Sequence, residues 1–187
     1  MLGGIRPHSQ NQPIVIVVMG IDPGIASTGF GVVRVSGAST HAIDGGVIES
    51  PSDETPERRL AQIHAEVEKL LGWHAPVALA LEDLYFGKNA RSAIGVGQAR
   101  GAVMLAAAQR NVPCFDYTPQ AVKMAVCGSG AADKAQVQRM VGTLLGLPRA
   151  PASDHTADAL AVAICHAGHA ASAPPTGATR PKAVSVG

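Results

Sequence analysis

One short apolar run ends in a carboxylate near the start of the chain, at residues 14–24, IVIVVMGIDPG. A run of about this length, rich in Val and Ile and closed by turn residues, predicts a strand buried on both faces. Asp22 stands where that strand leaves the sheet, so its carboxylate can be held rigidly and still be reached by a ligand. Asp-Pro-Gly is also a common turn sequence, in which the aspartate only supports the turn. The run alone leaves both interpretations open.

Four further apolar segments predict the rest of a sheet. Residues 28–35 and 41–48 are separated by a Ser-Gly turn, which predicts an antiparallel three-strand meander with the first strand. Residues 77–81 and 112–117 each follow a helical segment, which is typical of strands that run parallel in a sheet covered by helices. The fold class predicted is therefore α/β: a five-stranded mixed sheet, the meander plus two parallel strands, flanked by helices.

The chain has 187 residues, a length that suits one domain with loose ends. Residues 1–13 and 169–187 are polar or rich in small residues and lack any period, so we expect a flexible N-terminal extension and a disordered C-terminal tail. The folded domain is expected at 14–168. The N-terminal extension has no signal-peptide core, and no apolar run is long enough to cross a membrane.

The net charge of +1 does not indicate nucleic-acid binding, so any basic surface has to be local. Three cysteines without metal-type spacing, in or beside apolar segments, favour reduced thiols and a cytoplasmic protein.

A second predicted strand also ends in a carboxylate, Glu82. If this strand is the parallel neighbour of the first, the two lie about 4.8 Å apart and bring Asp22 and Glu82 to the same edge of the sheet. Two close carboxylates repel each other and raise one pKa unless a cation lies between them. Oxygen ligands of this kind suit Mg²⁺ or Mn²⁺.

The last predicted helix begins with Asp154-His155-Thr156-Ala157-Asp158 and continues as an apolar segment to about residue 167. Asp154 has a strong alternative role, since acids favour helix N-termini. Asp22, Glu82, His155 and Asp158 together would form a site for two divalent ions, which favours phosphodiester hydrolysis. The chain contains no G-x-S-x-G motif for acyl transfer.

Several basic and aromatic residues lie near these acids in the sequence. Each lysine alone is more often solvated surface, and each aromatic can anchor its loop in the core instead of stacking on a base. The candidates for DNA binding are Lys88, Arg91, Arg100, Lys123, Lys134, Tyr85 and Phe86. The segment from 88 to 110 also carries Gly97 and Gly101 four residues apart, and such small residues allow close packing on the protein's own sheet or against a second copy.

Five motifs follow one another along the chain. They are GIDPG at 20–24, LED at 81–83 with KNA at 88–90, GQARG at 97–101, ADK at 132–134 with QV at 136–137, and ADALA at 157–161. On these motifs the chain resembles the RuvC-type Holliday-junction resolvases of bacteria, in the ribonuclease H-like superfamily, from about Val17 to His166. Each motif alone is weak, but five in order are very specific.

The resemblance implies a homodimer that binds four-way DNA junctions and nicks two strands of like polarity symmetrically in recombination and repair. It implies Mg²⁺ or Mn²⁺, two ions per site, and cooperation with the RuvA–RuvB branch-migration complex. Asp22, Glu82 and Asp158 match three of the family's four acidic metal ligands. Lys123 and Lys134 match lysines needed for cleavage and phosphate contact, and Tyr85 or Phe86 matches an aromatic near the junction's exchange point.

The fourth acidic position is the one departure from the pattern, because His155 stands there and Asp154 precedes it. A histidine can ligate Mn²⁺ or act as a general base. We therefore place His155 in the site, as a catalytic residue together with the three acids and Lys123, and keep Asp154 as a neighbouring partner or helix cap.

Two other functions compete with this one. Asp22-Pro23-Gly24 followed by Gly29 and Gly31 resembles the first phosphate loop of actin-like and sugar-kinase proteins, although this chain is too short for the second domain that they need. A junction-binding scaffold without catalysis is the other alternative, and the intact acids argue against it.

Overall fold

The structure is a computed structural model that describes residues 14–83, 90–151 and 153–172. Its five strands form one mixed sheet in the order β3-β2-β1-β4-β5. Strand β1 pairs antiparallel with β2 and parallel with β4, and β5 lies parallel at the far edge beside β4. The strands are β1 (Val15–Asp22), β2 (Ser27–Ser36), β3 (Ser39–Glu49), β4 (Ala78–Glu82) and β5 (Cys114–Tyr117). The predicted meander and the two parallel strands are confirmed.

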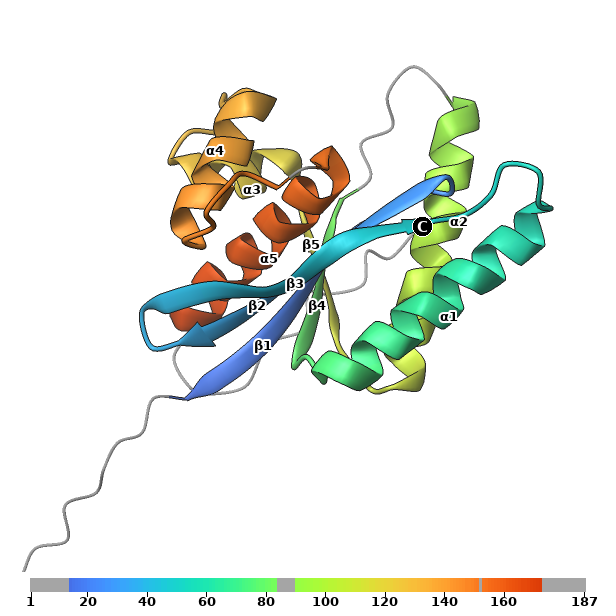
Figure 1. Cartoon of the computed structure of the whole chain (residues 1–187), viewed down its shortest axis with the longest axis horizontal. Helices are drawn as coiled ribbons and strands as arrows, with labels where there is room; N and C mark the ends of the chain where they lie inside the picture. The colour runs from blue at the N-terminus through green and yellow to red at the C-terminus, as the bar shows by residue number, and fades with distance from the viewer. Residues whose placement is uncertain (1–13, 84–89, 152, 173–187) are drawn as a thin grey trace, which may run out of the picture.

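Helices cover both faces of the sheet (Figure 1). Helices α1 (Pro56–His74) and α2 (Ala90–Gln109) lie on one face, and α3, α4 and α5 lie on the other. The second group comprises α3 (Pro119–Cys127), α4 (Lys134–Leu144) and α5 (Asp154–Ser172). None of the helices in the described ranges is long and apolar enough to cross a membrane.

The alternation of side chains along β1 and β4 divides the core in two. Met19 and Ile21 of β1 pack with α1 and α2, whereas Val18 packs with α5. In β4, Leu79 and Leu81 face α1 and α2, and Ala80 faces α5. Because successive side chains of a strand point to opposite faces, the next residues in the second series, Asp22 and Glu82, lie on the α5 side.

Glycines in β1 and β2 allow the backbone of α5 to lie directly on the sheet. A Cβ atom built on Gly20 would lie 2.0 Å from the carbonyl oxygen of Ala159, and one on Gly29 would lie 2.1 Å from that of His155. At Gly31 a Cβ would meet the Leu160 side chain at 2.7 Å. Any side chain at these positions would push α5 away from the sheet, so these glycines determine the depth at which its N-terminal turn lies.

The ends of α1 and α5 are defined by the structure, and α5 extends beyond its predicted end at about residue 167. Helix α1 continues through Gly72 to His74, where Gly72 leaves room for the guanidinium of Arg110, 3.2 Å from a built Cβ. Its C-cap is Ala75, whose positive φ of 43° and N–H bond to the carbonyl of Leu71 end the helix. Helix α5 continues to Ser172, so the first part of the segment 169–187, expected to be disordered, is helical.

The turn before α4 is fixed by a capping box. The Asp133 carboxylate accepts a hydrogen bond from the backbone N–H of Gln136, and the Gln136 side chain accepts one from the N–H of Asp133. This reciprocal arrangement satisfies two backbone donors at the start of the helix. It places Lys134 at the first position of α4, next to the N-terminus of α5.

Candidate active site

Asp22 and Glu82 lie at the C-terminal ends of two adjacent parallel strands. In the register of β1 and β4, Ile21 pairs with Leu81, so Asp22 and Glu82 are the next residues on the two strands. Both face α5, as the strand alternation requires. The sequence prediction that the two strand ends meet at one edge is therefore supported by the pairing.

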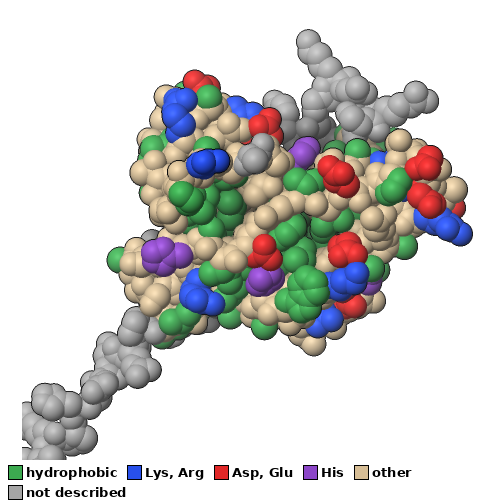
Figure 2. Space-filling model, viewed as in Figure 1, with side chains coloured by type: hydrophobic (Ala, Val, Ile, Leu, Met, Phe, Trp, Pro, Cys, Tyr) green, Lys and Arg blue, Asp and Glu red, His purple; other side chains and the backbone are tan. Residues whose placement is uncertain are grey.

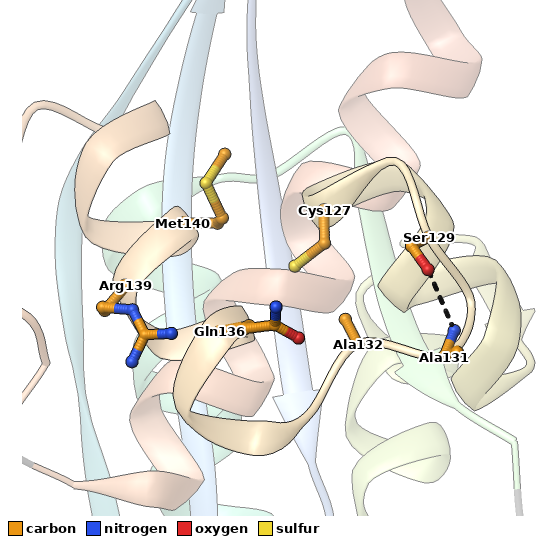
Figure 3. A pocket seen from close by; sticks show the side chains of 7 residues that line it. All are labelled: Cys127, Ser129, Ala131, Ala132, Gln136, Arg139 and Met140. Carbon is orange, nitrogen blue, oxygen red and sulfur yellow. Dashed lines mark hydrogen bonds between the residues drawn. The ribbon is translucent and has the colours of Figure 1, made fainter.

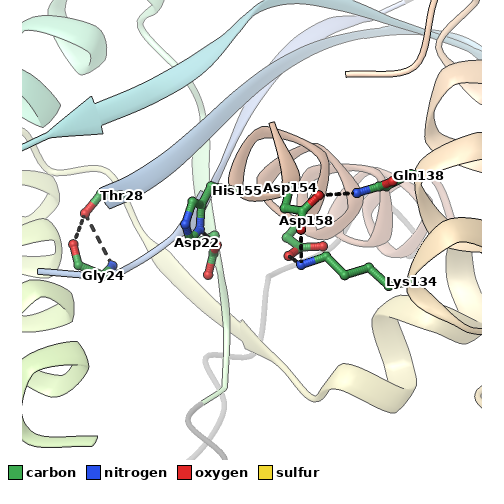
Figure 4. A network of polar contacts seen from close by, with 8 residues as sticks. All are labelled: Asp22, Gly24, Thr28, Lys134, Gln138, Asp154, His155 and Asp158. Atoms are coloured by element: carbon green, nitrogen blue, oxygen red, sulfur yellow. Dashed lines mark hydrogen bonds and ion pairs between the residues drawn. The ribbon is translucent and has the colours of Figure 1, made fainter. Parts of the chain in front are cut away.

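His155 is brought to Asp22 by the first turn of α5. Its Nδ1 lies 2.7 Å from Oδ2 of Asp22 (Figure 4). Gly29 is the partner of Asp22 in the antiparallel pair of β1 and β2, and it is also the residue on which the His155 backbone lies. The missing side chain at Gly29 thus allows the histidine to reach the carboxylate.

Asp158 lies one turn further along α5 and pairs with a lysine of α4. The Nζ of Lys134 lies 3.4 Å from Oδ2 of Asp158 and 3.0 Å from Oδ2 of Asp154. Asp154 also accepts a hydrogen bond from the Gln138 amide at 2.5 Å. Figure 4 shows Asp154 turned toward α4, on the side away from Asp22. Asp154 therefore acts as a partner of α4 rather than as a member of the carboxylate cluster.

Burial, together with the charges of neighbouring acids, raises the pKa of Glu82 and of Asp158. Burial raises the pKa of Glu82 to about 7, with further contributions from the charges of Asp22 and Asp158, while Lys123 and Lys134 oppose the shift. The pKa of Asp158 is also raised, first by burial, and Asp22 adds to that effect. Three carboxylates therefore share one partly buried region whose positive charges do not fully compensate them.

A cavity of about 220 Å³ opens beside two of these acids. Glu82, Asp158, Lys123 and Lys134 contribute the polar part of its lining, and α3, α4 and α5 supply apolar side chains. Two acids and two lysines on one cavity suit a ligand that carries both a cation and a phosphate. Lys123 and Lys134 thus line the same cavity as Glu82 and Asp158.

The donor chemistry of the site fits a hard divalent cation, because carboxylate oxygens are its preferred ligands. Within the described residues, however, no group of three or more His, Cys, Asp or Glu side chains is arranged closely enough to hold a metal ion. Instead, Asp22 is paired with His155 and Asp158 with Lys134. A cation at this edge would compete with His155 and Lys134 for these carboxylates.

A larger cavity, of about 510 Å³, lies between α3 and α4 (Figure 3). Its lining comes from the end of α3, from α4 and from the loop between them: Cys127, Ser129, Ala131, Ala132, Gln136, Arg139 and Met140. This lining contains no carboxylate, and it shares no residue with the smaller cavity. The larger cavity is therefore separate from the acids.

Arg100 has a different environment from the one expected for a DNA contact. Its side chain is only 11% exposed; Nη1 donates to the carbonyl oxygen of Glu82 at 3.0 Å, and Nη2 pairs with Oδ1 of Asp116. This geometry does not support a phosphate contact. Tyr85, Phe86 and Lys88 lie outside the described residues, and so does the side chain of Arg91 in the first turn of α2.

The two glycines of the alternative phosphate loop have another role. Gly29 and Gly31 lie beneath the backbone and side chains of α5, at the distances given above. The close packing of α5 explains why both positions are glycine. The resemblance to actin-like and sugar-kinase phosphate loops therefore has no support in the fold.

Comparison with known proteins identifies the family of this chain. The profile of the family "Crossover junction endodeoxyribonuclease RuvC" matches residues 18–166. The chain belongs to the RuvC family. Membership confirms the predicted activity class, an endodeoxyribonuclease of crossover junctions and hence a hydrolase.

Relatives in the RuvC family are similar over most of their length. The crossover junction endodeoxyribonuclease RuvC of Natranaerobius thermophilus is 45% identical over 136 residues, which are 73% of this chain and 84% of that protein. The RuvC of Pelotomaculum thermopropionicum is 48% identical over 137 residues, with the same coverage of 73% and 84%.

Solved RuvC structures confirm the ribonuclease H-like fold that was predicted. Thermus thermophilus RuvC superposes with a TM-score of 0.78 at 42% identity, covering 83% of this chain and 95% of that chain. The same protein in complex with a Holliday junction substrate gives a TM-score of 0.80 at 41% identity, covering 84% and 96%.

The residues that hold the loop after Asp22 in place were not predicted from the sequence. Arg59 of α1 donates to the carbonyl oxygen of Ile25 at 3.1 Å and to Oγ of Ser50 at 3.0 Å, which fixes the loop that follows Asp22. Within this loop, Thr28 Oγ1 donates to the carbonyl oxygen of Gly24 at 2.7 Å. Thr28 and Ser50 are buried polar residues, a property that only the structure shows.

Proposed function

We propose that this chain resolves four-way DNA junctions by hydrolysing one phosphodiester bond in each of two strands of like polarity, with Mg²⁺ or Mn²⁺ as cofactor. Asp22, Glu82, His155 and Asp158 would hold the metal, and two ions per site are proposed. The observation that carries the proposal is the convergence of three carboxylates at the ends of β1, β4 and α5, where Glu82 has a pKa of about 7. When a divalent cation binds between carboxylates that lie close together, it removes their mutual repulsion.

Bound divalent ions would supply an activated water and stabilisation of the leaving oxygen. The chain's own residues orient the substrate around that chemistry. Lys123 and Lys134 line the cavity with Glu82 and Asp158, where their charges can neutralise the scissile phosphate. The hydrogen bond between His155 Nδ1 and Asp22 orients the imidazole, and Nε2 is then the atom that can take a proton or a metal ion.

The proposed dimer contact is the exposed face of α2. Ile94, Met104 and Leu105 are large apolar residues on this helix with exposed fractions of 64%, 41% and 54%. A Cβ built on Gly101, in the same helix, would meet nothing within 4 Å, so a second helix could approach it closely. A two-fold dimer carries two equivalent sites, which accounts for symmetric nicks in the two strands.

Junction recognition is proposed from the relatives and from local charge. Basic and acidic side chains are interspersed on the face shown in Figure 2, in keeping with a net charge of +1. The phosphate contacts are therefore proposed at Lys123 and Lys134, together with Lys88 and Arg91, and base stacking at Tyr85 or Phe86. A Thermus thermophilus relative has been solved with a Holliday junction substrate. Cooperation with RuvA–RuvB, in the bacterial cytoplasm, completes the proposal.

The test is cleavage of labelled four-way junctions and matched linear duplexes in Mg²⁺, in Mn²⁺ and in EDTA. We expect paired nicks on the junction alone, only with a metal ion present, and ends that a ligase can rejoin. Equal cutting of the duplex would disprove junction selectivity. Binding without cleavage in every metal would favour the scaffold function instead.

The proposed dimer contact on α2 is tested separately. Leu105→Glu should convert the dimer to a monomer in sedimentation and should separate the two nicks in time. Leu144→Glu is a matched control, because Leu144 is an exposed apolar residue of α4 with 43% exposure. A Leu105→Glu protein that stays dimeric would show that another surface forms the contact.

A further inference from the structure

Arg100 of α2 is hydrogen-bonded to the backbone of Glu82 in β4 and paired with Asp116 in the neighbouring strand β5. Its guanidinium donates through Nη1 to the carbonyl oxygen of Glu82 at 3.0 Å and through Nη2 to the carboxylate of Asp116. The side chain of Arg100 is 11% exposed and that of Asp116 is 51% exposed. An arginine this strongly buried has little access to solvent or DNA.

The Arg100 contacts lie on the sheet face opposite to the carboxylate of Glu82. Asp116 pairs with Leu81 and Tyr117 pairs with Glu82 in the parallel register of β4 and β5. Leu81 faces α1 and α2, so Asp116 faces α2 as well, while Glu82 faces α5. The guanidinium therefore reaches the end of β4 from the α2 face of the sheet. It contacts the backbone of Glu82, whereas the Glu82 carboxylate lies on the α5 face.

The last residue of β4 is paired on one side in the described sheet. Glu82 pairs with Tyr117 of β5, and the N–H of Asp83 donates to the carbonyl oxygen of Tyr117 at 2.8 Å, whereas the pairing of β4 with β1 ends at Leu81. Side chains that line a polar site under mutual repulsion need a rigid backbone to converge. At this position the fork of an arginine holds the last carbonyl of β4 and the adjacent strand at the same time.

We infer that Arg100 and Asp116 are positioning residues that fix the end of β4, so that the Glu82 carboxylate is held in the geometry required for metal binding. The inference rests on the proposed metal-dependent function. It changes the expectation for Arg100 from a phosphate contact to a support of the metal site. Groups that orient a metal ligand in this way typically affect metal affinity by 10–100-fold when they are removed.

Arginine is required at position 100 because two acceptors on different strands must be contacted together. Its planar guanidinium presents several N–H donors in a fixed fork, whereas lysine is a single point charge on a flexible stem. Arg100→Lys keeps the charge and most of the buried stem but cannot hold both acceptors in one geometry. Asp116→Asn keeps the shape and removes the charge partner, so it provides a second, independent variant.

The first measurement is Mn²⁺ binding to the full chain without DNA, by titration calorimetry. We expect Arg100→Lys and Asp116→Asn to raise the Mn²⁺ dissociation constant by about tenfold or more. The control is Arg110→Lys, because Arg110 pairs with Glu68 at 3.3 Å and ties the chain just after α2 to α1, away from Glu82. This control should bind Mn²⁺ as the wild type does.

The second measurement separates metal positioning from DNA contact. Junction affinity in EDTA should be unchanged within about twofold in Arg100→Lys, and its single-turnover cleavage should return toward the wild-type rate at high Mg²⁺. A wild-type Mn²⁺ affinity in both variants would overturn the inference. A loss of junction affinity in EDTA with normal Mn²⁺ binding would instead identify Arg100 as a phosphate contact. Wild-type protein that neither binds Mn²⁺ nor cuts junctions would refute the proposed function itself.

Discussion

His155 Nδ1 lies 2.7 Å from Asp22 Oδ2 although 133 residues separate the two in the chain. The contact depends on the packing of α5 against Gly29, the residue paired with Asp22 across β1 and β2. A second Asp–His pair, Asp44 with His74 at 2.8 Å, joins β3 to the end of α1 and lies outside the carboxylate cluster. The two pairs have similar distances, although His155 uses Nδ1 and His74 uses Nε2, and their surroundings differ, so His74 can serve as a control for His155.

Replacing His155 by Ala should reduce single-turnover junction cleavage by 10²-fold or more, the order expected when a group that handles a proton is lost. Junction binding in EDTA should be retained. Asp154→Asn should have a much milder effect, because Asp154 contacts Lys134 and Gln138 on the α4 side. His74→Ala should leave cleavage intact. A greater loss in Asp154→Asn than in His155→Ala would reverse the assignment of the two residues.

Metal binding should depend on pH through Glu82. Its pKa is raised to about 7, and a metal ion can bind the carboxylate only after the proton has left. The proton therefore competes below about pH 7, and Mn²⁺ affinity should rise with pH up to that value and then level off. The slope below pH 7 should approach tenfold per pH unit.

Calorimetry at several pH values checks the role of Glu82, with proton release measured from buffers of different ionisation enthalpy. Glu82→Gln should weaken Mn²⁺ binding and remove the associated proton release. Glu66→Gln is the control, since Glu66 pairs with Lys69 on the surface of α1. Affinity that does not change between pH 5.5 and 8 would contradict the prediction.

The strand ends could be predicted from the sequence because their signal is local. In each case one short segment contains the apolar residues of the strand and the acid, Asp22 or Glu82, at which the strand ends. The parallel pairing of these strands then followed from the helical segment between them. His155 was chosen from its position near Asp158 at the start of the last helix and then from the family resemblance, and its contact with Asp22 was visible only once α5 was placed on the sheet.

Arg100 and Gly29 show why the roles of other residues around the site could not be predicted. A basic residue near an acid in sequence resembles a phosphate contact, but Arg100 is neutralised by Asp116, which lies 16 residues later on a neighbouring strand. Gly29 was compared with a phosphate loop, whereas its role is to admit a helix that begins more than a hundred residues later. Both roles depend on tertiary packing, which leaves no periodic pattern in the sequence.

Gly29→Ala should destabilise the fold by about 3 kcal/mol, at the upper end of the cost of overpacking, because the new Cβ would lie 2.1 Å from a backbone oxygen of α5. Urea unfolding provides the measurement. Gly142→Ala in α4 is the control, since its Cβ would meet Ala150 at an ordinary contact distance of 3.5 Å. That variant should be as stable as the wild type or slightly more stable. Equal stability of Gly29→Ala and the wild type would show that α5 can move away from the sheet without cost.

Arg59→Lys should lower the rate of cleavage about tenfold and leave junction binding in EDTA unchanged. The reason is that a single lysine cannot replace the hydrogen bonds from Arg59 to Ser50 and Ile25 that hold the loop after Asp22. The neighbouring Arg58 is the control. It is 74% exposed and only 3.9 Å from Glu54, so Arg58→Lys should have no effect. Equal rates for the two variants would show that the loop is held without Arg59.

His166 makes the stability of the fold depend on pH, at a position two turns of α5 beyond Asp158. Its ring is buried, its Nδ1 lies 2.8 Å from the Tyr117 hydroxyl, and the Phe115 ring lies 4.6 Å away between centroids. Burial lowers the pKa of His166 from 6.5 to about 4, and the nearby His169 adds to the shift. The unfolded chain therefore takes up a proton at a higher pH than the folded chain does.

The sign of the effect follows from this difference in pKa. Above about pH 6.5 both states are neutral at His166 and the fold has its full stability; as the pH falls from 6.5 toward 4, only the unfolded state is protonated and stability is lost. The unfolding temperature should fall across that window, and His166→Asn should be less stable at pH 7 but show a flatter profile below it. His41→Asn, at an exposed site on β3, should keep the wild-type slope. An unchanged slope in His166→Asn would assign the acid sensitivity to other groups.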